Sequence, residues 1–403
     1  MLNATHHFPA LSTKPYGQRL AFLDNAASAH KPQVVINALT QALSGPYANI
    51  HRGLYFNSAE TTAAFESARQ TLATFFGAQP EELVFTRNST ESINLVAQTW
   101  GRQHLTATDS IVLTEAEHHA NIVPWQLLQA QIGFTIRVLP HTLLANPTEA
   151  DLTPYLQGAK LLAITAMSNV TGLKPNLPTI LAAAKSHGLT ILVDGSQSAV
   201  HAPTHLSTVP CSLFTDFFVC TAHKLYGPTG IGLLWARTDM LNNLPPYQGG
   251  GDMIDTVHLP TGTTYASGNA RFEAGTPAIA EAIAFAAAAD FVTSLGWEAI
   301  TAHEAHLADL LTHTLTDLPF LELYSPPATG IAAFNIKGAH AADVATLLDQ
   351  QGVAVRSGHH CAMPYLKALG TPNCLRASLA LYSTPQDIAQ LAAALQKTAK
   401  MLL

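Results

Sequence analysis

The sequence predicts an α/β protein with two domains. Strand-like apolar runs alternate with helix-like segments from residue 83 onward, which is typical of βαβ units and of a mostly parallel sheet between helices. Strands and helices interleave again after residue 316, which predicts a smaller α+β domain. With 403 residues, of which 48% are hydrophobic and 12% charged, the chain can bury two cores.

We expect three regions along the chain. Residues 1–20 are an N-terminal arm that packs with the small domain, residues 21–277 form the large domain, and residues 278–403 form the small domain. After the arm, a short strand precedes a helix at 34–43. The next helix is expected to begin with a capping box of Asn57 and Glu60 and to end at Gly77.

A strand at 83–86 leads through a polar turn into a helix that begins near Thr90. Ser89 and Thr90 add hydroxyl groups to the free N–H groups of that helix start, and such a cup can hold a phosphate. Ser and Thr are also ordinary N-cap residues, so this motif is weak by itself.

Polar residues follow other apolar strands, where open α/β sheets place their ligands. Asn169 follows one strand, and Asp194 ends the apolar run of residues 190–193. We therefore expect the strand ends near Thr86, Asn169 and Asp194 to meet in one crevice. The glycine-rich and proline-rich residues 244–277 are expected to form an irregular excursion with a hairpin.

Lys224 lies in a polar turn between two apolar runs, within the sequence FFVCTAHKLYGPTGIGLL of residues 217–234. Many such lysines merely reach the surface from a strand end. A lysine desolvated by apolar strands and by His223 would instead have a lowered pKa and a nucleophilic amine. Together with the buried carboxylate of Asp194, it supplies the two protein groups that pyridoxal phosphate requires.

The second domain contains a polar turn within the sequence VAVRSGHHCAMP. It holds Arg356, His359, His360 and Cys361, and Arg376 begins another strand. Single cysteines are usually small buried hydrophobes, but a thiol in this company is expected to be accessible and biased toward the thiolate. Arg376 is the best candidate to bind a substrate carboxylate. We expect helices at 278–316, 340–351 and 385–402, and strands near 321–325, 330–337, 353–356 and 375–382.

Composition excludes several classes of function. The net charge of −7 is spread without basic stripes, so nucleic acid is not an expected partner. No targeting segment and no membrane span is expected, and we place the protein in the cytoplasm. The 19 histidines form no recognised ligand spacing, so no metal site is expected. A disulfide framework is not expected either, because the four cysteines include no CxxC pair; they are Cys211, Cys220, Cys361 and Cys374.

In motif order and spacing, the chain resembles the class V aminotransferase-like enzymes of pyridoxal-phosphate fold type I, and within them the SUF-type (group II) cysteine desulfurases. The resemblance covers nearly the whole chain and is carried by these motifs: FLDNAAS, HRG, TRNSTESINLVA, EHHANIVPW, SNVTG, VDGSQ, TAHKLYGPTGIG, RFEAGTP, RSGHHCAMP and LRASLALY. It implies a large domain with a sheet of the seven-stranded type and a homodimer.

The resemblance also implies the roles of individual residues. Lys224 would form the Schiff base, Asp194 pair with the ring nitrogen, His118 stack on the ring, and Gln197 bind the ring oxygen. Phosphate contacts would come from Ser89, Thr90, Thr221 and His223, and from Gly275 and Thr276 of a neighbouring subunit. Cys361 would accept the sulfur. The substrate L-cysteine would meet Arg376, Asn169, His51 and Arg356.

Three departures from the family pattern are present. Thr221 and Ala222 replace Ser-Gly, Asn88-Ser89 replaces Gly-Thr, and Tyr55 stands where a histidine is frequent. Hydroxyl groups persist at positions 89 and 221, so phosphate binding is still expected.

The expected reaction converts L-cysteine to L-alanine and hands the sulfur to a SufE- or SufU-like acceptor. Alternatives on the same scaffold are a selenocysteine lyase acting on L-selenocysteine and another class V aminotransferase or lyase, in which Cys361 would be dispensable. A histidine-rich metal-binding protein with an inactive pocket is a further alternative from a different class. Either His118 or the His359-His360 pair could handle the thiol proton.

Overall fold

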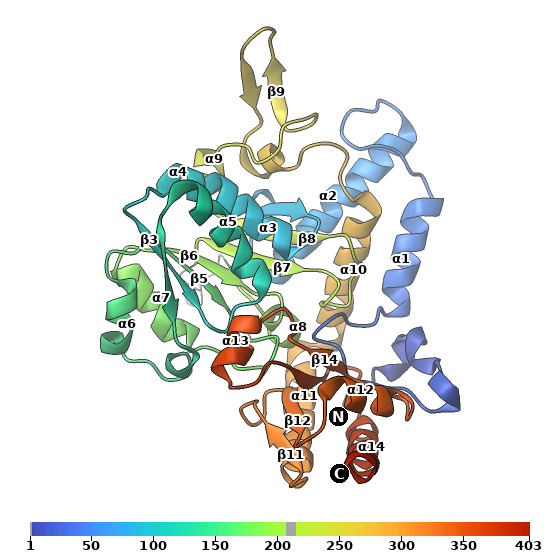
Figure 1. The fold of residues 1–403 in the computed structure, drawn as a ribbon. Helices are drawn as coiled ribbons and strands as arrows, with labels where there is room; N and C mark the ends of the chain where they lie inside the picture. Colours follow the sequence, from blue (N-terminus) through green and yellow to red (C-terminus); the bar gives the residue numbers. More distant parts are fainter. Residues whose placement is uncertain (1, 207–214) are drawn as a thin grey trace.

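The computed structural model describes residues 2–206 and 215–403, so Cys211 lies outside the described residues. A seven-stranded sheet with the order β2-β8-β7-β6-β5-β3-β4 forms the centre of the described chain (Figure 1). Its strands are β2 (Leu83–Thr86), β3 (Ser110–Thr114), β4 (Thr135–Leu139), β5 (Leu161–Thr165), β6 (Thr190–Asp194), β7 (Phe217–Thr221) and β8 (Gly232–Ala236).

Only β8 runs antiparallel to its neighbours in this sheet, and the other pairings are parallel. All residues of β3, β5, β7 and β8 are buried, because helices cover both faces. This arrangement confirms the predicted α/β class and brings the carboxyl ends of β5, β6 and β7 to one edge.

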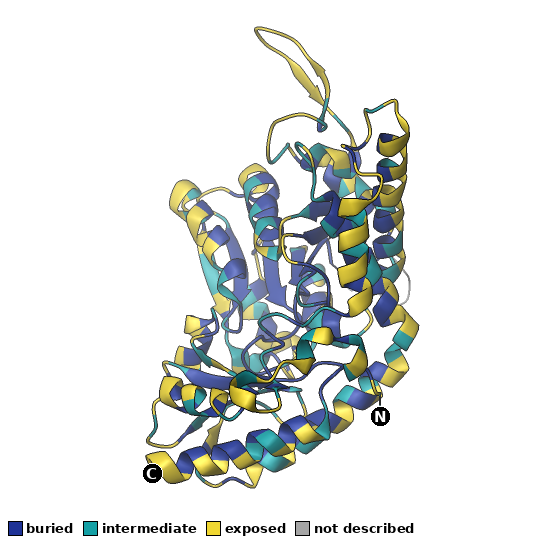
Figure 2. Cartoon of the chain, turned by 90° about the vertical axis from the view of Figure 1, so that its right-hand side faces the viewer, coloured by how far each residue is buried: buried dark blue, intermediate teal, exposed yellow. Residues whose placement is uncertain are grey.

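The helices expose one face and bury the other, as the alternating blue and yellow of Figure 2 shows. The helices of the first part are α1 (Gln33–Ser44), α2 (Phe56–Phe76), α3 (Ser89–Val96), α4 (Arg102–His104), α5 (Val123–Ile132), α6 (Glu149–Leu156), α7 (Leu177–Ser186), α8 (Ser198–His201) and α9 (Thr238–Asn243). Those that follow are α10 (Ile279–Leu295), α11 (Trp297–Thr316), α12 (Ala341–Asp349), α13 (Met363–Ala368) and α14 (Pro385–Leu402). A π-helical turn spans Ala97–Gly101, and short 3-10 turns span Thr5–His7, Pro9–Ser12, Pro15–Gly17, Pro80–Glu82, His119–Asn121, His141–Leu143 and Gly268–Phe272.

The predicted capping box at the start of α2 is wrong. Helix α2 begins at Phe56, its N-cap is Tyr55, and no side chain caps it, so Asn57 and Glu60 already lie within the helix. A spacing of Asn and Glu marks a helix start only where the backbone turns, and here the N-cap lies two residues before Asn57. Gly77 does end the helix, with a left-handed φ of 59°.

A second, antiparallel sheet has the order β11-β12-β15-β14. Its strands are β11 (Leu321–Leu323), β12 (Ile331–Ile336), β15 (Cys374–Ser378) and β14 (Arg356–Gly358). The strand predicted at 353–356 is divided, because Val353–Ala354 forms β13 and pairs instead with β1 (Ala21–Phe22). The strand predicted at 375–382 ends early, at Ser378.

The N-terminal segment contacts residues near the C-terminus of the chain. Tyr16 donates to Asp349 at 2.9 Å, and Arg19 forms an ion pair with Asp387 at 2.8 Å. These contacts agree with an arm that packs with the small domain, although the boundaries at residues 20 and 277 stay predictions.

The predicted hairpin is present in the excursion between α9 and α10. It consists of β9 (Ile254–Val257) and β10 (Thr263–Tyr265), and it projects from the rest of the chain (Figure 1). Over residues 2–206 and 215–403, no single helix has the length and apolar character of a membrane span. Helices α10 and α11 reach that length and apolar character only when they are taken together, and the chain bends by 80° between them.

Candidate active site

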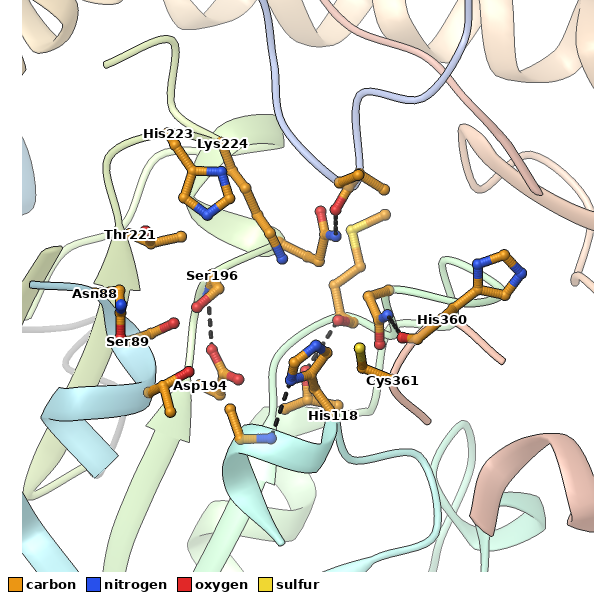
Figure 3. Close-up of a pocket in the computed structure, with 18 of the residues that line it drawn as sticks. Asn88, Ser89, His118, Asp194, Ser196, Thr221, His223, Lys224, His360 and Cys361 are labelled. Carbon is orange, nitrogen blue, oxygen red and sulfur yellow. Dashed lines mark hydrogen bonds between the residues drawn. The ribbon is translucent and has the colours of Figure 1, made fainter. Parts of the chain in front are cut away.

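One pocket lies between the carboxyl edge of the large sheet and the small sheet (Figure 3). Its wall is formed by strand ends, the start of α3, the N-terminal segment at Ala26 and Ala27, and the turn at His360 and Cys361 (the cysteine turn). It is lined by Ala26, Ala27, Asn88, Ser89, Thr90, His118, Ala120, Thr165, Met167, Asn169, Asp194, Ser196, Gln197, Thr221, His223, Lys224, Arg356, His360, Cys361 and Arg376.

Lys224 and Asp194 reach into this pocket from adjacent strand ends, as Figure 3 shows. Lys224 follows β7, and burial lowers the pKa of its amine to about 8, against the opposing effect of Asp194. Asp194 ends β6, is 5% exposed, and accepts a hydrogen bond from the N–H of Ser196 at 3.0 Å. A weakly basic amine thus faces a fixed carboxylate, as the sequence predicted.

The start of α3 forms a polar cradle on another wall. The side chain of Asn88 caps the helix by accepting from the N–H of Glu91 at 3.0 Å. The N–H groups of Ser89 and Thr90, at the first two helical positions, have no partner within the helix. Thr221 Oγ1 and Ser196 Oγ are buried without a hydrogen-bond partner, although buried hydroxyls normally have one. The cradle therefore has unused donors for an anion.

His118 lies in the pocket as a neutral ring. Its Nδ1 accepts from the N–H of Ala120 at 3.0 Å, so the ring proton is on Nε2. Burial, followed by the charge of Lys224, lowers the pKa of His118 to about 4. The hydrogen bond at Nδ1 therefore fixes the orientation of the ring, and the N–H at Nε2 is available to a ligand in the pocket.

Glu117 supports this region and was missed by the sequence reasoning. It is fully buried, and burial raises the pKa of its carboxyl group to about 8. It accepts hydrogen bonds from Thr114 Oγ1, the N–H of Thr165 and Asn121 Nδ2. These bonds tie the segment that carries His118 to β3 and β5. An acidic residue beside two histidines gave no indication in the sequence that it would be buried.

The cysteine turn has an unusual backbone. His360 and Cys361 have φ of 51° and 54°, a left-handed region that non-glycine residues rarely adopt. The turn is held from outside, because Asn169 Nδ2 donates to the carbonyl oxygen of His360 at 2.7 Å. The backbone N–H of His119 donates to the carbonyl oxygen of Cys361, also at 2.7 Å. Strain of this kind persists where surrounding contacts fix it, often at functional sites.

Two histidine rings flank the thiol. A ring nitrogen of His119, a ring nitrogen of His359 and Cys361 Sγ all lie within 4.8 Å of one another. His359 Nδ1 accepts from the N–H of Cys361 at 3.1 Å, and His119 Nε2 accepts from the N–H of Met363 at 3.0 Å. Each ring thus uses one nitrogen to hold the turn. Sequence reasoning did not single out His119, because only the fold brings it to the cysteine.

His360 is turned away from this pair. Its Nε2 donates to the carbonyl oxygen of Cys374 at 3.0 Å, and its Nδ1 is buried without a partner. Burial, with Arg376 next, lowers the pKa of His360 to about 3. His360 therefore serves as a neutral link between the cysteine turn and β15.

Two arginines of the pocket, Arg356 and Arg376, are register partners on the neighbouring strands β14 and β15 of the small sheet. Arg376 is 2% exposed, and its guanidinium donates to the carbonyl oxygen of Asn169 at 2.8 Å and to Asp24 at 2.9 Å. Its Nε has no partner. The part of the pocket wall that these arginines form is therefore cationic and suited to a carboxylate.

Three of the predicted site residues lie outside this pocket. His51, with a φ of 70°, is exposed and bonds Glu66 at 3.0 Å. Gly275 and Thr276 line a second cavity together with Arg87 and Tyr247. The other predicted site residues line the pocket, and what they do there stays a prediction.

The pocket fits pyridoxal phosphate in each of its parts. A buried amine of lowered pKa suits the aldehyde, a buried carboxylate suits a protonated ring nitrogen, and the unpartnered hydroxyls beside a helix start suit the phosphate. Fold and site together define a protein of the pyridoxal-phosphate-dependent fold type I class.

The comparisons with known proteins narrow that class. Residues 21–391 match the model of the aminotransferase class-V family, and the chain belongs to this family. A cysteine desulfurase of Klebsiella pneumoniae is 45% identical over 402 residues, which are 98% of this chain and 97% of that protein. A cysteine desulfurase of Yersinia pseudotuberculosis is likewise 45% identical, over 398 residues and the same shares of the two chains.

Solved structures agree with this family. The cysteine desulfurase CsdA of Escherichia coli, in an S-sulfonic acid form, has a TM-score of 0.89 and 36% identity, covering 99% of this chain and 98% of that one. The apo cysteine desulfurase of Thermococcus onnurineus NA1 has a TM-score of 0.91 and 33% identity, covering 98% of this chain and 99% of that one.

Proposed function

We propose that this protein is a pyridoxal-phosphate-dependent cysteine desulfurase, which converts L-cysteine to L-alanine and receives the sulfur as a persulfide on Cys361. The observation that carries the proposal is that Lys224 and Asp194, from adjacent strand ends, line one pocket with Cys361 from a distant part of the chain. The relatives at 45% identity over the full length support it.

Several of the pocket residues would hold the cofactor. Lys224 would bind its aldehyde, Asp194 its ring nitrogen and His118 a face of its ring, while Ser89, Thr90, Thr221 and His223 would bind its phosphate. Gln197 already donates one N–H to the carbonyl oxygen of Ala26 at 2.8 Å, and its second N–H is available for the ring oxygen. When bound, pyridoxal phosphate acts as an electron sink that makes the Cα proton of the substrate acidic.

Lys224 is suited to remove that proton. With a pKa of about 8, a useful fraction of its amine is neutral near neutral pH, whereas an ordinary lysine would be almost fully protonated. The substrate carboxylate would meet Arg376 and Arg356, and Asn169 would lie beside it. His118 could exchange a proton through Nε2, because Nδ1 is already engaged.

Cys361 then takes the sulfur. Its thiolate forms an S–S bond as the Cβ–S bond of the substrate breaks, and the electron pair of the broken bond stays with the substrate carbon. That carbon takes a proton, Cα regains the proton that Lys224 removed, and alanine leaves. The left-handed turn and its bonds to His119 and Asn169 would hold Sγ in place for this attack.

The partners are also part of the proposal. Gly275 and Thr276 lie beside the second cavity, away from the pocket of their own chain, which is consistent with completing the phosphate site of another subunit in a homodimer. A SufE- or SufU-like protein would receive the persulfide sulfur, as in the SUF-type enzymes. A cytoplasmic location remains a prediction from the sequence.

A persulfide-trapping experiment tests the proposed function. The protein is exposed briefly to L-cysteine, alkylated and digested, and the extra sulfur is located by peptide mass. We expect it on Cys361, and we expect Cys361→Ser to keep the yellow cofactor while losing persulfide and sulfide release. Cys374→Ala, which changes a buried cysteine outside the pocket, should keep both. Extra sulfur on another cysteine, or full desulfuration by Cys361→Ser, would overturn the proposal.

The choice of substrate needs a separate measurement. Alanine release from L-cysteine and from L-selenocysteine is compared under the same conditions, with Cys361→Ser as control. A desulfurase depends on Cys361 with L-cysteine. A protein that releases alanine only from L-selenocysteine would instead be a selenocysteine lyase.

A further inference from the structure

A second lysine of lowered pKa lies close to Lys224, and the proposed mechanism does not use it. Lys31 follows the N-terminal segment that lines the pocket with Ala26 and Ala27. Lys31 is partly buried, and this burial lowers the pKa of its amine to about 8. A lysine that only covered apolar surface would extend its charge into solvent.

The ammonium group of Lys31 binds two backbone carbonyl oxygens. It donates to the carbonyl oxygen of His223 at 2.9 Å and to that of Ala29 at 2.5 Å. The carbonyl oxygen of His223 also accepts from the N–H of Ala29 at 3.1 Å and from Ser28 Oγ at 3.3 Å. Residues 28–31 thus surround one carbonyl group with three donors, and that carbonyl immediately precedes Lys224.

The turn that carries Lys224 needs such support. Tyr226, two residues further on, has a left-handed φ of 58°, which a residue with a bulky side chain rarely adopts. Within the turn, the N–H of Gly227 donates to the carbonyl oxygen of Ala222 at 2.9 Å. A turn under backbone strain keeps its shape only if contacts from outside fix it. The segment 28–31 provides such contacts at His223.

The charge of Lys31 also acts on this turn. The pKa of the His223 imidazole is lowered to about 4 by burial first, then by the charges of Lys224 and Lys31. A hydrogen bond from an ammonium group is stronger than one from a neutral donor. Lys31 therefore donates a strong hydrogen bond to the carbonyl oxygen of His223 and places a positive charge near the imidazole of the same residue.

We propose that Lys31 is a positioning residue for Lys224: by holding the carbonyl oxygen of His223, it fixes the direction in which the amine of Lys224 enters the pocket. The inference rests on the proposed function, since it assumes that Lys224 is the reacting amine. Lys31 itself does not line the pocket. Its effect on the reaction is therefore exerted through the turn.

Two variants test the proposal. Lys31→Met keeps an unbranched side chain of similar length but removes the donor and the charge, while Lys31→Gln keeps a neutral donor. Lys400→Met, at an exposed position in α14, is the matched control. For each holoenzyme we would measure kcat and KM for L-cysteine, cofactor content, and the melting temperature.

We expect Lys31→Met to lower kcat by about tenfold or more, because a small misplacement of a catalytic group is costly. KM should stay within about twofold, since the residues for the substrate carboxylate are unchanged, and kcat is expressed per bound cofactor because His223 also belongs to the proposed phosphate site. Lys31→Gln should restore part of kcat, and Lys400→Met should match the parent. If Lys31 only stabilised the fold, Lys31→Met would lower the melting temperature but would not lower kcat while leaving KM unchanged. A kcat of Lys31→Met within about twofold of the parent would overturn the proposal.

Hydrogen exchange separates this inference from the proposed function. Exchange of the backbone amides of residues 27–31 and 221–227 is followed in the cofactor-free full chain, where no turnover is needed. We expect Lys31→Met to exchange there at least about tenfold faster than the parent, with other regions unchanged. If Lys31→Met exchanged faster but the parent protein showed no desulfuration, the proposed function would be wrong. The role of Lys31 in holding the turn of Lys224 would still be supported. Unchanged exchange with intact parent activity would reject the role of Lys31 alone.

Discussion

His119 holds Cys361 through the backbone: its N–H donates to the carbonyl oxygen of Cys361 at 2.7 Å, and its side-chain Nε2 accepts from the N–H of Met363 at 3.0 Å. Both bonds lie on the C-terminal side of the cysteine, one at its own carbonyl group and one at the N–H two residues later. They join a segment of the large sheet to a turn more than two hundred residues away, and they keep the thiol at the edge of the pocket.

Replacing His119 with alanine removes only the side-chain bond to Met363 and leaves the backbone bond to Cys361. We expect persulfide formation on Cys361 to slow by about tenfold, because a less restrained thiol attacks less often in the right geometry. Cofactor colour should persist. Single-turnover trapping of the persulfide measures the effect, and His104→Ala, at an exposed position, is the control. An unchanged trapping rate would show that the backbone bond suffices.

Replacing Lys224 with alanine should abolish alanine release. The variant should remain folded, because it removes an amine whose burial is the largest cause of its lowered pKa, although the attraction of that amine to Asp194 is lost as well. Borohydride reduction followed by peptide mapping should attach the cofactor to Lys224 in the parent and to no lysine in the variant. Turnover near the parental rate would contradict the assignment.

Replacing Asp194 with asparagine keeps the shape of the side chain but removes its charge. We expect turnover to fall by roughly two orders of magnitude or more, because in the proposed function the carboxylate would keep the ring nitrogen of the cofactor protonated. Cofactor content, measured by absorbance, should fall much less than kcat. A change of kcat below about threefold would indicate another partner for the ring.

The stability of the protein should decrease in mild acid because of its buried histidines. His360 has a pKa of about 3 in the folded chain against an ordinary value of 6.5, so between these values the unfolded state binds more protons. This contribution to the free energy of unfolding is complete above pH 6.5 and declines as the pH falls toward 3. His118 and His223, both with a pKa of about 4, act in the same direction.

Urea unfolding of the parent and of His360→Asn across this pH range measures the effect. The unfolding midpoint should fall less steeply in the variant, because one of the three histidines no longer resists protonation. His104→Asn, at an exposed position, should keep the parental slope. Equal slopes for His360→Asn and the parent would show that His360 is not among the groups responsible.

Local patterns predicted most of the secondary structure, because apolar periodicity and turn residues act over short distances. The strand at 83–86 and the helix at 385–402 match the structure in full. The prediction failed where local preference was ambiguous, as at Asn57 and Glu60. It also failed where pairing partners decided the outcome, as when residues 353–356 were divided between two sheets.

The sequence by itself determined the chemical inventory of the protein: a lysine between apolar strands, an aspartate at a strand end, and a cysteine in a polar turn. These follow from the types of residues and their immediate neighbours. The tertiary structure decided which of them meet, and it added Glu117, His119 and Lys31, whose importance depends on burial and on contacts with distant backbone groups. Hydrogen bonds such as those from Lys31 to His223 and from Asn169 to His360 join residues nearly two hundred positions apart. No local pattern encodes such pairs, because they arise only when the chain packs.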